Sequence, residues 1–270
     1  MKNLYTVKAI AEKTWVIECK TYYYQGLMYV LEGNDRAMVI DAGFNLGDFG
    51  AAVKSVTTLP ADLYITHGHL DHVGSAHQFG NCYIDPADLP VLAAHTDGEY
   101  LRRLAKEATP AWQRLLLRGA VKAMTTPPPK SRFQPMPETV DLGGRVVEVV
   151  NTPGHTAGGV CFLDRETRSL FSGDTLCDWG VLLHLEFCDT LEAYLASLRR
   201  LKALEPAYDN VYGGHHGYPV KAGAPDKYIK CAEGALNGEI TLKADKQGFI
   251  AFYDDIRITL PKGFTRAKSS

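Results

Sequence analysis

The chain has 270 residues, 46% of them hydrophobic, and a formal net charge of −2 with Lys and Arg spread along its length. This composition fits one sizeable core and argues against a nucleic-acid partner, because no basic surface is concentrated enough to neutralise phosphates. The segment 1–18 has no continuous apolar stretch, so we expect no signal peptide, no membrane span or membrane partner, and a cytoplasmic location. The cysteines form no CxxC pair and are expected to be buried, reduced thiols.

The first part of the chain predicts short strands separated by turns. The runs are rich in β-branched and aromatic residues, and Gly33-Asn34-Asp35 is a hairpin signal, which together indicate an antiparallel start. Apolar spacing predicts a helix over 46–57. The predicted strands are 15–18, 27–32, 36–41, 63–66 and 81–85.

The middle of the chain predicts a helical insertion at about 95–137. Residues 87–124 have helical spacing that Thr109-Pro110 interrupts, and the prolines from Pro127 onward form a stiff connector. The second half returns to strands followed by turns. Its predicted elements are strands 146–150, 159–163, 170–172 and 210–212, helices 191–204 and 226–237, and a hairpin of 248–253 with 256–260.

The most informative segment is the run His67-Gly68-His69-Leu70-Asp71-His72, which directly follows a predicted strand. Three imidazoles and one carboxylate so close together favour a metal site, since these are the ligands of reactive zinc centres. The alternative is an accidental His-rich loop, but such loops rarely place ligands on a strand-to-helix turn. His77 and His95 fall in predicted helical stretches and are interpreted as structural.

Three later turns supply further candidate ligands, and each contains glycine next to an apolar strand. Strands of one sheet can bring their carboxyl ends to a common edge, so we expect these turns to converge over a crevice. With the run, they hold enough ligands for two metal ions. The turns are Thr152-Pro153-Gly154-His155-Thr156, Ser172-Gly173-Asp174-Thr175 and Gly213-Gly214-His215-His216-Gly217.

The series HxHxDH, TPGHT, SGDTL and GGHHG, in this order and spacing, resembles the metallo-β-lactamase superfamily over nearly the whole chain. The resemblance implies an α/β (α+β) fold, a four-layer αββα sandwich, as a single domain over 1–270. It assigns His67, His69 and His155 to the first metal, Asp71, His72 and His215 to the second, and Asp174 to both as a bridge. His215 is preferred to His216 because it follows the double glycine as the family's last ligand does.

The resemblance also implies a chemistry. In the family's scheme two Zn²⁺ share a bridging hydroxide, which the catalytic Asp71 orients for attack on a carbonyl. We therefore expect a metal-dependent hydrolase of a small ester, thioester or lactone, with Fe or Mn as alternative cofactors in one or both positions. One major class of true β-lactamases has a cysteine at the position of Asp174, so the chain looks more like the glyoxalase II and lactonase branches.

Other activities of the same superfamily stay open. A mononuclear iron dioxygenase acting on glutathione persulfide uses a subset of these ligands, and a β-lactamase or a phosphodiesterase or nuclease shares the motifs. The nucleic-acid branches are expected to carry an additional domain or exosite, which neither the length nor the charge of this chain favours. A binding protein without catalysis is a third reading, although all seven candidate ligands are present.

The expected partner is a small-molecule substrate, and the candidate substrate-binding residues are Tyr22, Tyr23 and His184. Alternate tyrosines on a half-buried strand would explain the tyrosines equally well. The insertion, with Trp112 and Arg102-Arg103, is a candidate cap over the cleft. The lysines near the last helix, residues 221, 227 and 230, form no convincing site for glutathione carboxylates. The terminal hairpin offers an edge through which a homodimer could form.

Overall fold

The structure is a computed structural model that describes residues 4–20, 24–108, 122, 125–178 and 180–266. The chain divides into two compact units. Unit 1 comprises Met1–Pro137 and Asp141–Arg145, and unit 2 comprises Glu138–Val140 and Val146–Ser270. The expectation of a single domain over 1–270 stays a prediction.

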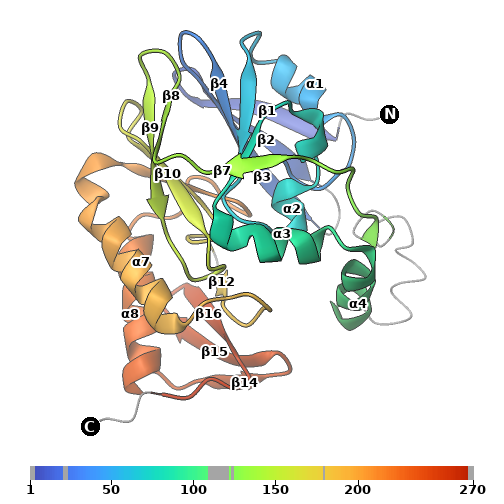
Figure 1. Cartoon of the computed structure of the whole chain (residues 1–270). Coiled ribbons are helices and arrows are strands. Elements are labelled where there is room, and N and C mark those ends of the chain that lie inside the picture. Colours follow the sequence, from blue (N-terminus) through green and yellow to red (C-terminus); the bar gives the residue numbers. More distant parts are fainter. Residues whose placement is uncertain (1–3, 21–23, 109–121, 123–124, 179, 267–270) are drawn as a thin grey trace. The chain divides into compact units, whose positions relative to one another are not determined.

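Unit 1 contains a mixed sheet. Its strands are β1 (Tyr5–Ala11), β2 (Thr14–Lys20), β3 (Gln25–Glu32), β4 (Ala37–Ile40), β5 (Ala61–Tyr64), β6 (Cys82–Ile84) and β7 (Phe133–Pro135), and they follow one another in this order across the sheet (Figure 1). The pairs from β1 to β4 are antiparallel, and the pairs from β4 to β7 are parallel. The predicted antiparallel start is therefore confirmed.

The helices of unit 1 are shorter than the apolar spacing predicted. They are α1 (Phe49–Lys54), α2 (Leu70–Val73), α3 (Leu89–His95) and α4 (Gly98–Ala108), with 3₁₀ turns η1 (Ala76–Gln78) and η2 (Pro86–Asp88). The helix predicted over 46–57 begins only at Phe49, because the Asp48 carboxylate caps it by accepting from the Ala51 amide at 2.9 Å. The long helical stretch already breaks after α3, where Asp97 accepts from the amides of the first turn of α4. The predicted break at Thr109-Pro110 lies outside the described residues.

Unit 2 contains two sheets and two long helices. Its strands are β8 (Thr139–Asp141), β9 (Val146–Asn151), β10 (Val160–Asp164), β11 (Ser169–Gly173), β12 (Val181–Leu182), β13 (Asn210–Gly213), β14 (Lys243–Asp245), β15 (Gly248–Tyr253) and β16 (Ile256–Pro261), and its helices are α7 (Leu191–Ala203), η3 (Glu205–Ala207) and α8 (Ala224–Asn237). One sheet has the order β13-β11-β10-β9-β8, and the other β12-β16-β15-β14. The helices α7 and α8 pack side by side, and α8 covers β15 and β16 (Figure 1). The predicted helices and terminal hairpin of this half are confirmed.

Two buried tyrosines fix the turn that follows β11. Tyr194 of α7 donates its hydroxyl to the Thr175 carbonyl at 2.8 Å, and Tyr228 of α8 donates to the Cys177 carbonyl at 2.9 Å. Their rings meet edge to face with centroids 6.3 Å apart in the core of unit 2. The turn that carries Asp174 is therefore attached to the helices as well as to its own strand.

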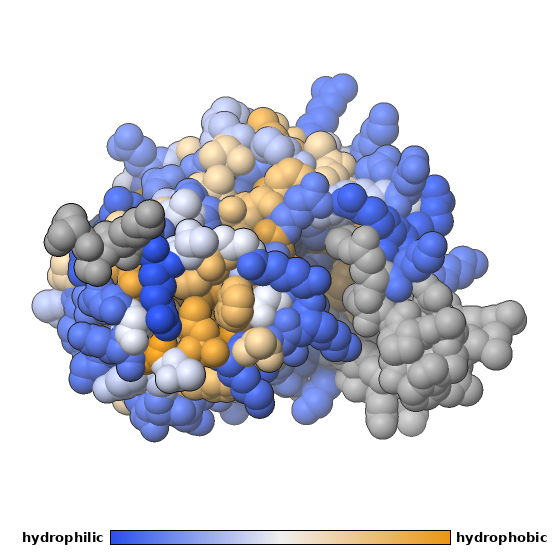
Figure 2. All heavy atoms as spheres, turned by 90° about the horizontal axis from the view of Figure 1, so that it is seen from below, coloured by the Kyte–Doolittle hydropathy of each residue, from blue (hydrophilic) through white to orange (hydrophobic). Residues whose placement is uncertain are grey.

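None of the helices in the described part of the chain has the length and apolar character needed to cross a membrane. The face shown in Figure 2 has hydrophobic residues in patches that are bordered by hydrophilic ones.

Candidate metal centre

The candidate ligands of each unit follow strands that end at one edge of a sheet. In unit 1, β4 and β5 are parallel neighbours, so Asp41 after β4 and the run after β5 emerge at the same edge. In unit 2, β9 and β11 are each antiparallel to β10, and β13 is parallel to β11. The turns after β9, β11 and β13 therefore share an edge as well. The three predicted turns of unit 2 thus share an edge, whereas convergence of all four segments over one crevice stays a prediction.

The run of unit 1 brings its ligand atoms together in pairs. His67 Nε2 and His69 Nδ1 lie 3.1 Å apart, and His72 Nε2 lies 3.9 Å from Asp71 Oδ2. Two nitrogen ligands of one tetrahedral zinc ion are roughly 3.3 Å apart, given Zn–N bonds of about 2.05 Å. The first pair therefore has the spacing of two ligands of a single ion. The three imidazoles are buried, whereas the Asp71 side chain is 25% exposed.

Asp41 is a functional residue that sequence reasoning missed. It is 2% exposed and accepts three hydrogen bonds, from the Thr66 amide at 2.8 Å, from the Thr66 hydroxyl at 2.8 Å and from His72 Nδ1 at 2.7 Å. Because a carboxylate only accepts, His72 must carry its proton on Nδ1, which leaves the Nε2 lone pair as the one that can bind a metal. The sequence feature that could have identified Asp41 is an acidic residue directly after a buried strand, in the segment Val39-Ile40-Asp41-Ala42-Gly43.

The same carboxylate also orients His67 through Thr66. The Thr66 hydroxyl has one proton, which it donates to Asp41, so it accepts from His67 Nδ1 at 3.1 Å. His67 is thereby held in the tautomer whose Nε2 accepts. One buried acid fixes the protonation of two candidate ligands.

Gly68 allows the run to turn close to α3. Its amide donates to Asp88 Oδ2 at 2.6 Å, and a Cβ at this position would lie 2.8 Å from the Leu92 backbone nitrogen. His95, at the end of α3, accepts from the Leu70 amide at 3.3 Å, and its ring centroid lies 4.5 Å from that of His69. His95, interpreted as structural, therefore packs against a candidate ligand.

In unit 2, the two carboxylate oxygens of Asp174 face two different histidines. Oδ2 lies 3.5 Å from His155 Nε2, and Oδ1 lies 3.4 Å from His215 Nε2. His155 donates its Nδ1 proton to the Leu182 carbonyl at 2.7 Å, which again leaves Nε2 as the metal-binding nitrogen. The next residue, His216, has a backbone φ of 66°, and its ring centroid lies 6.1 Å from that of His215.

Of the predicted substrate-binding residues, the structure describes only His184. Tyr22 and Tyr23 lie outside the described residues, as does Trp112 of the insertion. The neighbouring Tyr24 donates its hydroxyl to the Asp71 carbonyl at 3.1 Å, which ties it to the run. His184 lies in the loop after β12, and its role in substrate binding stays a prediction.

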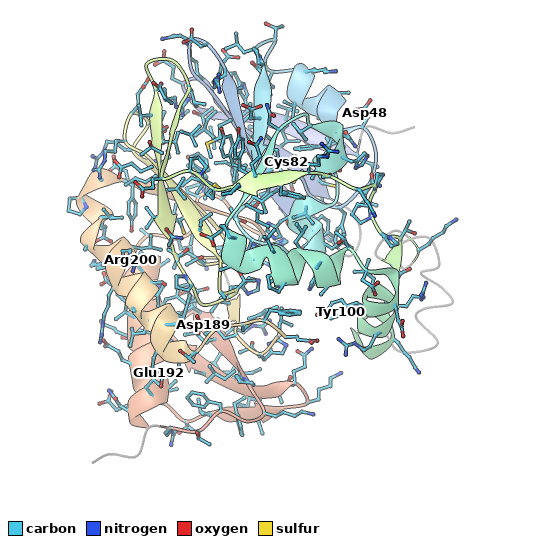
Figure 3. The ribbon with its side chains drawn as sticks, in the orientation of Figure 1. Asp48, Cys82, Tyr100, Asp189, Glu192 and Arg200 are labelled. Carbon is cyan, nitrogen blue, oxygen red and sulfur yellow. The ribbon has the colours of Figure 1, made fainter. Side chains whose placement is uncertain are left out.

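The cationic helix α4 presents a solvated face. Arg102 and Arg103 are exposed, and the Arg103 guanidinium lies over the ring of Tyr100, which Figure 3 labels. These residues line a surface depression of about 620 Å³ together with acidic neighbours.

The thiols are unsuited to nucleophilic chemistry. All six cysteines are unoxidised, and five of them are buried. Burial raises the pKa to about 11 for Cys19, Cys82 and Cys161 and to about 12 for Cys231. The predicted burial is confirmed for five of the cysteines, whereas Cys188 is only partly buried.

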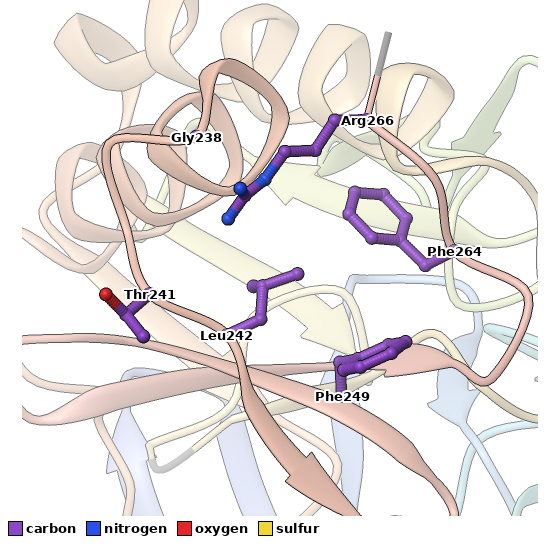
Figure 4. Close-up of a pocket in the computed structure, with 6 residues that line it drawn as sticks. All are labelled: Gly238, Thr241, Leu242, Phe249, Phe264 and Arg266. Carbon is purple, nitrogen blue, oxygen red and sulfur yellow. The ribbon is translucent and has the colours of Figure 1, made fainter.

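A cavity of about 460 Å³ in unit 2 lies away from the candidate ligands. Figure 4 shows its lining residues, which are Gly238, Thr241, Leu242, Phe249, Phe264 and Arg266. Arg266 donates to the backbone carbonyls of Ala235 and Ile240 at 3.3 and 3.0 Å, so its charge neutralises groups at the end of α8. The cavity contains no candidate ligand and is not part of the metal centre.

Known hydrolases resemble the chain at low identity. Acyl-coenzyme A thioesterase MBLAC2 from Gallus gallus is 26% identical over 235 residues, which cover 76% of this chain and 82% of that protein. The match to its bovine and human counterparts covers 66% of their length. Hydroxyacylglutathione hydrolase GloC from Haemophilus influenzae is 26% identical over 164 residues, 60% of this chain and 71% of that protein. A probable polyketide biosynthesis zinc-dependent hydrolase, BaeB from Bacillus velezensis, is 24% identical over 74% of this chain and 78% of its own length.

The fold and the family are both recognised. A metallo-beta-lactamase from Pontibacter korlensis superposes with a TM-score of 0.61 at 17% identity, covering 85% of this chain and 99% of that chain, which confirms the predicted fold. The model of the metallo-beta-lactamase superfamily matches residues 22–215, a span that includes every candidate ligand. The chain belongs to the metallo-β-lactamase superfamily.

Proposed function

We propose that the chain is a dinuclear zinc hydrolase that cleaves a small thioester. The observation that carries this proposal is Asp174, whose two oxygens face different histidines at 3.4 and 3.5 Å, as a carboxylate that bridges two ions would. The proposed ligands are His67, His69 and His155 for one ion, Asp71, His72 and His215 for the other, and Asp174 for both.

The donor set fits zinc. Imidazole nitrogen and carboxylate oxygen without thiolate are typical of catalytic rather than structural zinc sites. The tautomers also fit, because His67, His72 and His155 each donate their Nδ1 proton and present Nε2. A mononuclear iron dioxygenase would not need the bridging arrangement of Asp174, which is why we rank it second.

Two zinc ions bound here would lower the pKa of a shared water towards neutrality and so supply the nucleophile. The residue that orients this water is Asp71. Its side chain is the most exposed of the ligand candidates in unit 1, and its backbone carbonyl is held by the Tyr24 hydroxyl. A carboxylate on this anchored backbone can accept a hydrogen bond from the water and keep a lone pair of the water directed at the carbonyl carbon.

Among thioesters, a coenzyme A thioester is the substrate that we favour. The lysines near α8 do not decide between thiol carriers, because they already have partners and would leave glutathione carboxylates and coenzyme A phosphates equally without a cation. Lys221 and Lys227 pair with Asp255 at 2.9 and 2.7 Å, and Lys230 lies over the Tyr253 ring. The thioesterase name of the avian relative supports a coenzyme A thioester as the first compound to test.

A substrate panel with metal analysis on the same preparation tests the proposal. We expect two zinc ions per chain and turnover of acyl-coenzyme A that exceeds turnover of acyl-glutathione, acyl-homoserine lactones, β-lactams and phosphodiesters. One iron per chain with oxygen consumption would favour the persulfide dioxygenase instead. Clearly substoichiometric metal after purification without chelators would refute both.

A further inference from the structure

The loop of residues 183–188, which follows β12, contains a half-buried histidine whose two ring nitrogens are buried and have no hydrogen-bond partner among the described residues. Both ring nitrogens of His184 are inaccessible to solvent, and neither is hydrogen-bonded to any part of the chain that the structure describes. A buried imidazole N–H normally finds a partner, because leaving it unpaired costs its full desolvation free energy. A bound molecule that accepts this proton would remove the cost.

The loop is attached at both ends to the turn that carries His155. At its start, the Leu182 carbonyl accepts the Nδ1 proton of His155 at 2.7 Å. At its end, the amide of Asp189, labelled in Figure 3, donates to the Gly154 carbonyl at 2.8 Å. His184 therefore lies in a segment whose two ends are fixed beside a candidate metal ligand.

The loop is also strained. Phe187 has a φ of 75°, in the left-handed region that a bulky side chain rarely adopts. Such conformations persist only where the surroundings enforce them, and they gather at ligand-binding sites. An unpaired donor and a strained aromatic residue within one short loop indicate a segment kept for binding rather than for stability.

A cation lies two residues before the point where β16 meets the start of this loop, because the Leu183 amide donates to the Thr259 carbonyl at 2.8 Å and Arg257 precedes Thr259 by two residues. β12 pairs with β16 so that Val181 is opposite Ile258, which places Gly180 next to Arg257. A Cβ on Gly180 would lie 2.5 Å from Arg257 Cγ, so this glycine makes room for the half-buried arginine. The pKa of His184 is lowered, mainly by burial and next by the charge of His155. The charge of Arg257 also lowers it, whereas Asp245 raises it.

We propose that His184 and Arg257 form a subsite that binds an anionic oxygen, of a phosphate or a carboxylate, on the thiol portion of the substrate. His184 donates one ring N–H to this oxygen, and the Arg257 guanidinium supplies the opposite charge. The inference rests on the proposed thioesterase function, because it identifies which part of a thioester the loop recognises.

The variant His184→Phe tests the subsite, since it keeps the ring and removes both nitrogens. For the free protein we expect a melting temperature equal to or above that of the wild type, because no hydrogen bond is lost. We expect the ratio of kcat/KM for acetyl-coenzyme A to kcat/KM for the neutral S-acetyl-N-acetylcysteamine to fall at least tenfold, mainly through KM. His184→Gln, which retains an N–H donor, should recover part of this ratio. Acetyl-glutathione in parallel distinguishes a carboxylate from a phosphate.

His77→Phe is the matched control, because His77 also has a buried ring nitrogen without a partner among the described residues but lies in η1 of unit 1. It should leave the selectivity ratio unchanged. An unchanged ratio in His184→Phe, or a lowered melting temperature with an equal loss on all substrates, would overturn the subsite. If the wild type cleaves no thioester, the proposed function fails. Calorimetric titration of wild type and His184→Phe with coenzyme A and with glutathione then tests anion binding by itself, and equal affinities in the two proteins would overturn it.

Discussion

Asp41→Asn should weaken metal binding without unfolding the protein. The asparagine side chain keeps an oxygen for the Thr66 amide, but it places an N–H₂ group where Oδ2 now accepts from His72 Nδ1 at 2.7 Å. Asparagine also tolerates the φ of 61° at this position. The substitution therefore removes the contact that fixes the tautomer of His72 and leaves the backbone in place.

The size of the effect follows from the bonds lost. One hydrogen bond to a charged group contributes about 1.5–3 kcal/mol. Loss of a partner that orients a metal ligand typically lowers metal affinity about 10–100-fold, or roughly 1.4–2.7 kcal/mol, so the two estimates agree. Asp41→Ala is less informative, because it leaves three buried donors unpaired at about 1–3 kcal/mol each, a sum comparable with the whole stability of a domain.

The assay is competition for zinc between the protein and a chromophoric chelator, with urea unfolding of the metal-free protein measured in parallel. We expect both zinc ions to bind about 10–100-fold more weakly in Asp41→Asn, because the lost oxygen accepts from His72 and also from the Thr66 hydroxyl that orients His67. Asp48→Asn is the matched control, since it makes the same chemical change at an exposed helix cap where Asp and Asn are equivalent. Wild-type affinity for both ions in Asp41→Asn would refute the role of this carboxylate.

Two further predictions concern the same centre, and a third concerns the cysteines. Asp71→Ala should keep a wild-type melting temperature, because its side chain is 25% exposed, but lose about 10²-fold or more in turnover. Gly68→Ala should lower the free energy of unfolding by about 1–3 kcal/mol and reduce the metal content, because its methyl group would lie 2.8 Å from a backbone nitrogen. Gly80→Ala is the control and should change neither quantity, because a Cβ at Gly80 has no neighbouring atom within 4 Å. Thiol titration of the native protein at pH 8 should label at most the partly buried Cys188 quickly, because pKa values of about 11 and above leave few of the buried thiols as thiolates. After unfolding, all six cysteines should react.

The strands and the run were predictable because their signals are local. β3, β4 and β5 are short runs of buried apolar residues, and the run follows the last of them after two residues. β1 was missed although Tyr5, Val7 and Ala9 alternate with Thr6 and Lys8, and only Tyr5 of this strand is buried. β12 has two residues and depends on pairing with β16, far along the chain. Such a strand exists only through its partner and leaves no pattern of its own.

Polar partners were the least predictable part of the centre. His72 and Asp41 are 31 residues apart, and nothing in either segment identifies the other. By contrast, the break between α3 and α4 had a readable signal, since Asp97 followed by Gly98 and Glu99 is a helix start. The prediction did not use this signal, because the helical spacing of apolar residues continues across the break between α3 and α4.

The chain positions its candidate ligands and its candidate selectivity residues by different means. Asp174 and His215 follow β11 and β13 by one or two residues, so the parallel pairing of these strands fixes where their side chains begin. His184 depends instead on a strained loop that is held through two hydrogen bonds to the His155 turn. A loop of this kind can change in sequence while the strands, and with them the ligands, stay in place. This separation agrees with relatives at 24–26% identity that carry names referring to different substrates.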